Sequence, residues 1–276
     1  MTPSSFSLIL ASLLLSSPIT AGAAQHPDTG IAPPLAVLGA ADAYEPVFDQ
    51  LRSLAPRGDR VAAVHGLVLQ RDAIHFHLDQ GELYFLSPVA GRTVGALFIG
   101  RGSVSFTPPW DIERTQLMRV LADSTLDARV SAVAFIFADS TPAELQRRLT
   151  FGASTPHPDG GPVGDAVDHL VEGRSHHVHP TLMSALLNGA ANGFFYAYVK
   201  RESGEDLMFE IDPQAGEEVL LLRGGRLNGQ KVQTVCQFPR ATELGDSLPA
   251  SDGDRNPLKV EAYRIETTMA KASGTS

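Results

Sequence analysis

The sequence is poor in cysteine. Cys236 is the only one among 276 residues, so no intrachain disulfide is possible. It lies in Lys231–Phe238, where hydrophobic and polar residues alternate. This pattern favours a small buried strand residue over a reactive thiol.

Complete signatures of common catalytic sites are also missing. None of the nine histidines is followed by glutamate, so the zinc-peptidase motif His-Glu-x-x-His is absent. There is no Gly-x-Ser-x-Gly elbow and no phosphate-binding loop, and Gly100-Arg-Gly102 lacks the third glycine of a dinucleotide fingerprint. Carboxylates are plentiful, but pairing them for acid–base catalysis requires knowledge of the fold. The sequence therefore predicts no catalytic, cofactor-binding or metal-ligating residue and no cofactor.

Clusters of basic residues and long apolar runs are lacking too. The net charge is −9 without grouped Lys and Arg, which argues against a nucleic-acid partner. Apart from the N-terminal run, no apolar stretch approaches the about 20 residues of a membrane span. Hydrophobic residues make up 43% of the chain and charged residues 19%, a composition typical of globular proteins.

The N-terminus has the features of a cleavable export signal, which we assign to residues 1–24. Ser7–Leu15 is a short apolar run, Pro18 breaks it, and Ala21-Gly22-Ala23 supplies small residues for cleavage. A buried N-terminal helix is the alternative. The signal predicts an exported protein that is periplasmic or extracellular.

The remaining chain divides by composition. Residues 25–41 are Pro- and Gly-bearing and predict a mobile leader. Residues 42–240 predict an α+β module, with two subdomains meeting near 150–190 as an open alternative. The Asp-rich stretch 241–257 predicts a linker or long loop, and 258–276 predicts the first strand of a following β domain.

Hydrophobic periodicity predicts an α+β fold, mainly antiparallel β meanders with a central group of short helices. The expected strands are Val61–Gln70, Ala73–Leu78, Gly81–Leu86, Val94–Ile99, Ser103–Thr107, Val130–Phe137, Gly193–Lys200, Leu207–Ile211, Glu218–Arg223, Lys231–Phe238 and Lys259–Thr268. Turns are expected at Asp79-Gln80-Gly81 and at Gly100-Arg101-Gly102. The expected helices run from Asp42 to Leu54, from Thr107 or Asp111 to Leu121, from a Ser140 cap to Leu149, and over Asp165–Glu172 and Pro180–Leu187.

Histidines are where a metal site would be sought, because imidazole suits zinc, copper or nickel. The candidates are His75, His77, His169, His176, His177 and His179. Three of them fall within four positions before Pro180, and His169 precedes them by seven residues. No further ligand lies at a family spacing, so a solvated loop before a helix is favoured. The pair on one face of the strand near residue 76 is likewise expected to be solvated.

Several segments together resemble the N-terminal region of large secreted bacterial proteins of the aminopeptidase N (gluzincin) type. They are Gly81–Gly100, Phe106-Thr-Pro-Pro, Glu113–Leu117, Phe137–Thr141 and Leu187–Tyr196. The resemblance covers about residues 60–268 and implies a β-rich region ahead of a metallopeptidase domain. The family's zinc motif, its downstream Glu and its Gly-x-Met-Glu-Asn motif have no counterpart here, so no catalytic residue carries over.

The resemblance implies an exported, non-catalytic module that packs with or assists a peptidase domain on a separate chain. It also implies a chain that stops where the peptidase domain would begin, as a truncated or a stand-alone product. The alternative is a periplasmic ligand-binding protein or enzyme whose site cannot be recognised from sequence.

Overall fold

The computed structural model describes residues 37–153, 158–172, 178–227 and 230–240. Contacts divide the chain into Met1–Val37 and Leu38–Ser276, and the fold below belongs to the second unit. The expected export signal, the linker and the expected strand Lys259–Thr268 lie outside the described residues.

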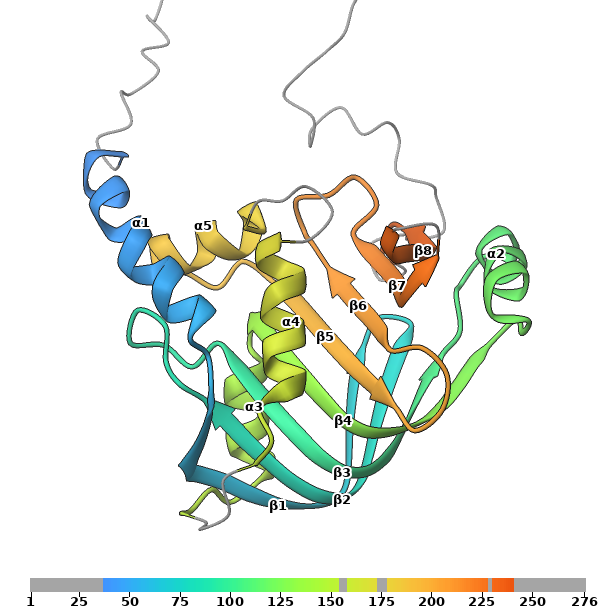
Figure 1. Ribbon diagram of the computed structural model, residues 1–276, viewed down its shortest axis with the longest axis horizontal. Helices are drawn as coiled ribbons and strands as arrows, with labels where there is room; N and C mark the ends of the chain where they lie inside the picture. The colour runs from blue at the N-terminus through green and yellow to red at the C-terminus, as the bar shows by residue number, and fades with distance from the viewer. Residues whose placement is uncertain (1–36, 154–157, 173–177, 228–229, 241–276) are drawn as a thin grey trace, which may run out of the picture. The chain divides into compact units, whose positions relative to one another are not determined.

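Eight antiparallel strands form one sheet whose spatial order follows the sequence, β1 to β8 (Figure 1). The strands are β1 (Pro56–Arg71), β2 (Ile74–Leu86), β3 (Gly95–Phe106), β4 (Leu126–Ala138), β5 (Phe194–Arg201), β6 (Leu207–Ile211), β7 (Val219–Leu227) and β8 (Gln230–Phe238). The helices are α1 (Val37–Arg52), α2 (Asp111–Leu121), α3 (Thr141–Arg148), α4 (Gly161–Glu172) and α5 (Pro180–Asn188). The α+β class with β meanders is confirmed. Because β4 pairs with β5 across the helical segment, the two strand-rich stretches are halves of one sheet rather than separate subdomains.

Two turns expected from the sequence are wrong. The predicted turn at Asp79-Gln80-Gly81 and the one at Gly100-Arg101-Gly102 are irregularities inside two long strands, β2 and β3. Gly81 faces Gly100 across this pair, and a Cβ on either would overlap backbone atoms of the other strand. Glycine here allows a close backbone approach that bends the strands, which is the other meaning of glycine in a strand pattern.

Both faces of the sheet are buried in its central part. Along β4, Val133, Phe135 and Phe137 belong to one hydrophobic cluster, whereas Ala134 and Ile136 belong to a second. The first, the inner cluster, takes side chains from one face of all eight strands and from α2 and α3. The second, the outer cluster, joins the opposite face to α1, α4 and α5. The continuous apolar run of this strand follows from its double burial.

The sheet curls strongly around the inner cluster. The rings of Phe76 on β2 and Phe209 on β6 have centroids 6.4 Å apart, and those of Phe106 on β3 and Phe238 on β8 are 6.1 Å apart. On a flat sheet these strands would be separated by about 19 and 24 Å, since each neighbour adds about 4.8 Å. The inner cluster therefore fills the concave face, and α1, α4 and α5 cover the convex face.

α2 and α3 lie where the sequence predicts them, but the residues at their N-terminal ends differ in role from those expected. Asp111 is the first residue of α2 rather than its cap, since the cap position is Trp110. Ser140 precedes α3 as expected but makes no side-chain cap bond. Asp139 supplies the side-chain bond instead, because its Oδ1 accepts the backbone N–H of Thr141 at 2.8 Å.

The first helix begins earlier than the sequence indicates, and the fifth ends as expected. α1 starts at Val37 instead of Asp42, and Leu38, Ala40 and Ala41 in the added turn are good helix formers. Gly189 ends α5 in the left-handed conformation (φ 63°), with its N–H bonded to carbonyl groups of the last turn. Among the described residues, no helix is long and apolar enough to cross a membrane.

Cys236 lies on β8 in the inner cluster and is 1% exposed. The prediction of a small buried strand residue is confirmed. Burial raises the pKa of its thiol to about 12, and the nearby Glu113 adds to the shift.

We predict that replacing Gly100 by Ala lowers the free energy of unfolding by at least about 2 kcal/mol, toward the upper end of point mutations. Gly100 has φ 155°, and an added Cβ would overlap the Gln80 carbonyl oxygen. Gly164→Ala is the control, because nothing lies within 4 Å of a Cβ at that position in α4. It should leave stability equal or higher. Denaturant titration measures both, and equal stability of the two variants would contradict the close approach.

We also predict that Cys236 resists alkylation in the folded protein. At pH 8 a thiol with pKa about 12 is about 10⁻⁴ ionised, against about one quarter for an ordinary cysteine. Iodoacetamide labelling, followed by mass spectrometry, should be at least about a thousandfold slower in buffer than in denaturant. Comparable rates would show that the thiol is accessible.

Candidate functional site

The convex face carries a cluster of one histidine and two carboxylates, which begins with His179. His179 occupies the N-cap position of α5, directly before Pro180, and has non-helical backbone angles. Its backbone N–H donates to the carbonyl group of Leu170 in α4 at 3.0 Å. Its ring lies against that of Phe194 on β5, with centroids 4.7 Å apart. The bond to Leu170 thus holds the backbone of His179 in place, and the Phe194 ring packs against its imidazole.

The two carboxylates come from the C-terminal end of β6. Glu210 lies on the strand between Phe209 and Ile211 of the inner cluster, so its side chain points to the convex face. Asp212 follows the strand and has the same parity. Its N–H donates to the Glu218 carbonyl group at 2.8 Å, and its Oδ1 accepts the Gln214 N–H at 2.9 Å. Asp212 is therefore held in place by the β6–β7 connection.

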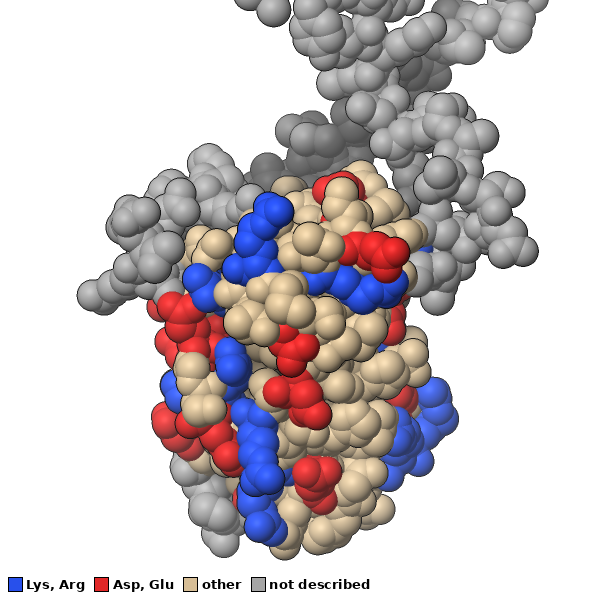
Figure 2. Space-filling model, turned by 90° about the vertical axis from the view of Figure 1, so that its right-hand side faces the viewer, with Lys and Arg blue, Asp and Glu red and all other residues tan. Residues whose placement is uncertain are grey.

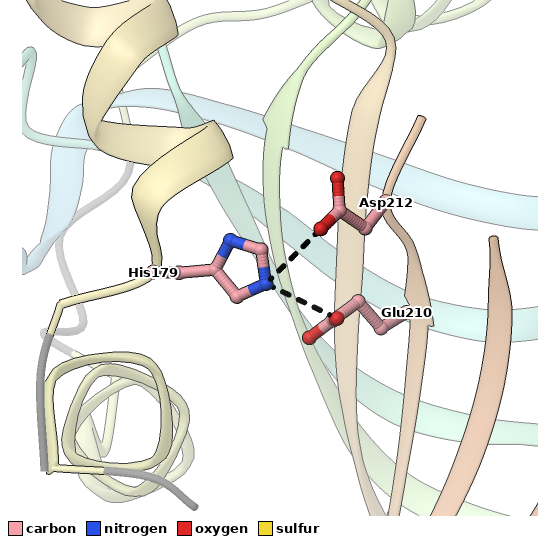
Figure 3. Close-up of side chains that lie close together, drawn as sticks. All are labelled: His179, Glu210 and Asp212. Atoms are coloured by element: carbon pink, nitrogen blue, oxygen red, sulfur yellow. Dashed lines mark hydrogen bonds and ion pairs between the residues drawn. The ribbon is translucent and has the colours of Figure 1, made fainter. Parts of the chain in front are cut away.

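These three side chains converge between α5 and β6 (Figure 3). The Nε2 atom of His179 lies 3.2 Å from Oε1 of Glu210 and 3.8 Å from Oδ2 of Asp212. One ligand atom from each residue lies within 4.8 Å of the other two. The side chains of His179, Glu210 and Asp212 are 18%, 13% and 15% exposed, so the cluster is mostly buried but still accessible to solvent.

The carboxylates control the charge of the imidazole. Burial lowers the pKa of His179, but the hydrogen bond with Glu210 and the negative charges of Glu210 and Asp212 outweigh it. The pKa of His179 is therefore raised above its usual value. Without a bound cation, a protonated His179 can offset part of the charge of the two carboxylates.

A buried tyrosine stands next to this group. Tyr196 on β5 is directly opposite Glu210 in the β5–β6 register and is 0% exposed. Burial raises the pKa of Tyr196 well above its usual value, and the charges of Glu210 and Asp165 add to the shift. Its hydroxyl group has no hydrogen-bond partner among the described residues, nor has Nδ1 of His179.

The structure separates the histidines that the sequence singled out. The solvated-loop interpretation is wrong for His179, which is mostly buried. His176 and His177 lie outside the described residues. His169, in α4, stacks on Tyr196 with ring centroids 5.8 Å apart and thus lines the same region.

His75 and His77 lie elsewhere, on a part of the convex face that the helices leave open. Both are partly exposed, and their rings stack with centroids 6.2 Å apart. Nε2 of His77 lies 3.4 Å from the Ser105 hydroxyl group. They share one strand face, as the alternation predicts.

Sequence reasoning missed Glu210 and Asp212. Their spacing of two places both on one face of a strand, but the strand itself gives no reason to pair them with a histidine 31 residues earlier. Only the tertiary structure, which places the start of α5 near the C-terminal end of β6, brings the three together.

Charges of the two signs are mixed on the side of the molecule that carries α2. Figure 2 shows Lys and Arg side chains interspersed with Asp and Glu there. The expectation that nucleic acid is not a partner stays a prediction.

In comparisons with protein-family models, curated proteins and solved structures, none matches the chain. The resemblance to the N-terminal region of aminopeptidase N-like proteins therefore stays a prediction. The site has to be judged by its own geometry.

Proposed function

We propose that the protein binds a divalent transition-metal cation through His179, Glu210 and Asp212. The observation that carries the proposal is the convergence of one imidazole nitrogen and two carboxylate oxygens in a partly buried place. In a four-coordinate site with ligand distances of about 2.0–2.2 Å, ligand atoms are about 3.3–3.6 Å apart. The separations of 3.2 and 3.8 Å around Nε2 differ from this by a few tenths of an ångström.

Charge and donor type favour the same class of ion. Two carboxylates and a neutral imidazole balance a divalent cation, which removes the cost of two like charges in a partly buried site. A mixed nitrogen and oxygen set suits zinc and its neighbours, whereas Mg²⁺ and Ca²⁺ prefer oxygen ligands alone. Three protein ligands leave a coordination position for water or a small ligand, the arrangement of an open site.

This proposal corresponds to the alternative reading of the sequence, an exported ligand-binding protein with a site that sequence does not reveal. The other function, a non-catalytic module that assists a peptidase domain on a separate chain, stays a prediction. So does export to the periplasm or the exterior.

We predict that chelator-treated protein binds Zn²⁺ more tightly than Mg²⁺ or Ca²⁺, as measured by isothermal titration calorimetry. Zn²⁺ at 100 times its dissociation constant should stabilise the fold by about 2.7 kcal/mol. His179→Gln and Asp212→Asn should each weaken Zn²⁺ binding by more than the roughly 10–100-fold that outer-shell changes cost. Asp212→Asn keeps Oδ1 as the acceptor for the Gln214 N–H, so the loop should stay in place.

The matched control is the double variant His75→Ala/His77→Ala, which removes two neighbouring histidines that lie outside the site. Its Zn²⁺ affinity should equal that of the parent. Zn²⁺ binding that survives both site variants, or that disappears only in the control, would overturn the proposal.

A further inference from the structure

Two polar groups on the convex face, one beside the proposed cation site and one within it, lack hydrogen bonds that each could supply to the other. The Tyr196 hydroxyl group is buried and, among the described residues, has no partner. A buried donor without an acceptor costs about 1–3 kcal/mol, so its position calls for an explanation.

The second group is the Glu210 carboxylate. Within the described chain its only side-chain hydrogen bond is with His179, through Oε1. Asp212 differs, because the Gln214 N–H already supports its second oxygen. Carboxylates that ligate metals are themselves hydrogen-bonded by outer residues, which orient them. Of the two carboxylates, Glu210 is the one that lacks such support.

The strand register brings these two groups together. Tyr196 and Glu210 are directly opposite residues of β5 and β6, so their side chains share the convex face with Cβ atoms about 4.5–5.5 Å apart. His169 stacks on the Tyr196 ring from α4 and limits its movement. The Tyr196 side chain therefore lies on the same face as that of Glu210, and its hydroxyl group is buried.

We propose that Tyr196 is a positioning residue of the cation site, whose hydroxyl group donates a hydrogen bond to the Glu210 carboxylate when a cation holds it. In the metal-free protein Glu210 turns toward His179. A cation between them takes over Nε2 and Oε1, and the other carboxylate oxygen accepts from Tyr196. This inference rests on the proposed function, because without a cation the Glu210 carboxylate keeps its hydrogen bond with His179.

The test is Tyr196→Phe in the full chain, with Zn²⁺ as the probe. The variant should bind Zn²⁺ about 10–100-fold more weakly, as expected for an outer-shell residue. Its metal-free melting temperature should equal or exceed that of the parent, because the substitution removes only an unpartnered hydroxyl group. A merely structural tyrosine would not produce this combination.

Tyr84→Phe is the matched control. Tyr84 is also buried, at 2% exposed, but its hydroxyl group already donates to Glu82, away from the site. This variant should melt at a lower temperature and keep the parental Zn²⁺ affinity.

A spectroscopic measurement on the parent protein tests the positioning role even if Tyr196→Phe does not fold. Zn²⁺ titration should change the near-ultraviolet difference spectrum of a buried tyrosine in the parent, and Tyr196→Phe should lose that change. If the parent binds Zn²⁺ through the cluster but Tyr196→Phe binds equally well, or if no tyrosine signal appears, the positioning role is wrong and the cation site stands. If the parent does not bind Zn²⁺, both proposals fall.

Discussion

The fold depends on contacts between aromatic rings from strands that are far apart in the sheet. Phe76, Phe106 and Phe209 touch across three or four strands, which is only possible because the sheet curls around them. Each ring removes a large apolar area from water, and edge-to-face contacts add to that gain. Because the chain has a single cysteine, this packing stabilises the fold without an intrachain disulfide.

The same curvature creates the place where a site can form. A filled concave face leaves the convex face for α1, α4 and α5, where α4 lies against β4 and β5 and α5 lies against β4. Polar groups at the border of this helix layer are neither in the hydrophobic core nor fully in water. His179, Glu210 and Asp212 lie at such a border, where ion pairs are stronger than on an open surface.

The sequence predicted the class of the fold and most of its elements, because alternation and capping signals are local. The strand Leu207–Ile211 has the expected bounds, and α2 ends at Leu121 as expected. The expected turns in β2 and β3 were wrong because glycine signals both a turn and a close backbone approach, and only the neighbouring strand decides between them. The candidate site could not be predicted from the sequence for a similar reason. A histidine before a helix and two acidic residues on a strand are each ordinary, and their meeting is a property of tertiary packing.

The hydrogen bond from His179 to Leu170 has a consequence for how this chain can vary. It joins the end of α4 to the start of α5 and so closes the base of the connection between them. A connection closed at its base can gain or lose residues at little entropic cost, since loop closure depends only weakly on length. The number of residues between positions 170 and 179 can therefore change over evolution, or by design, while the imidazole keeps its place beside β6.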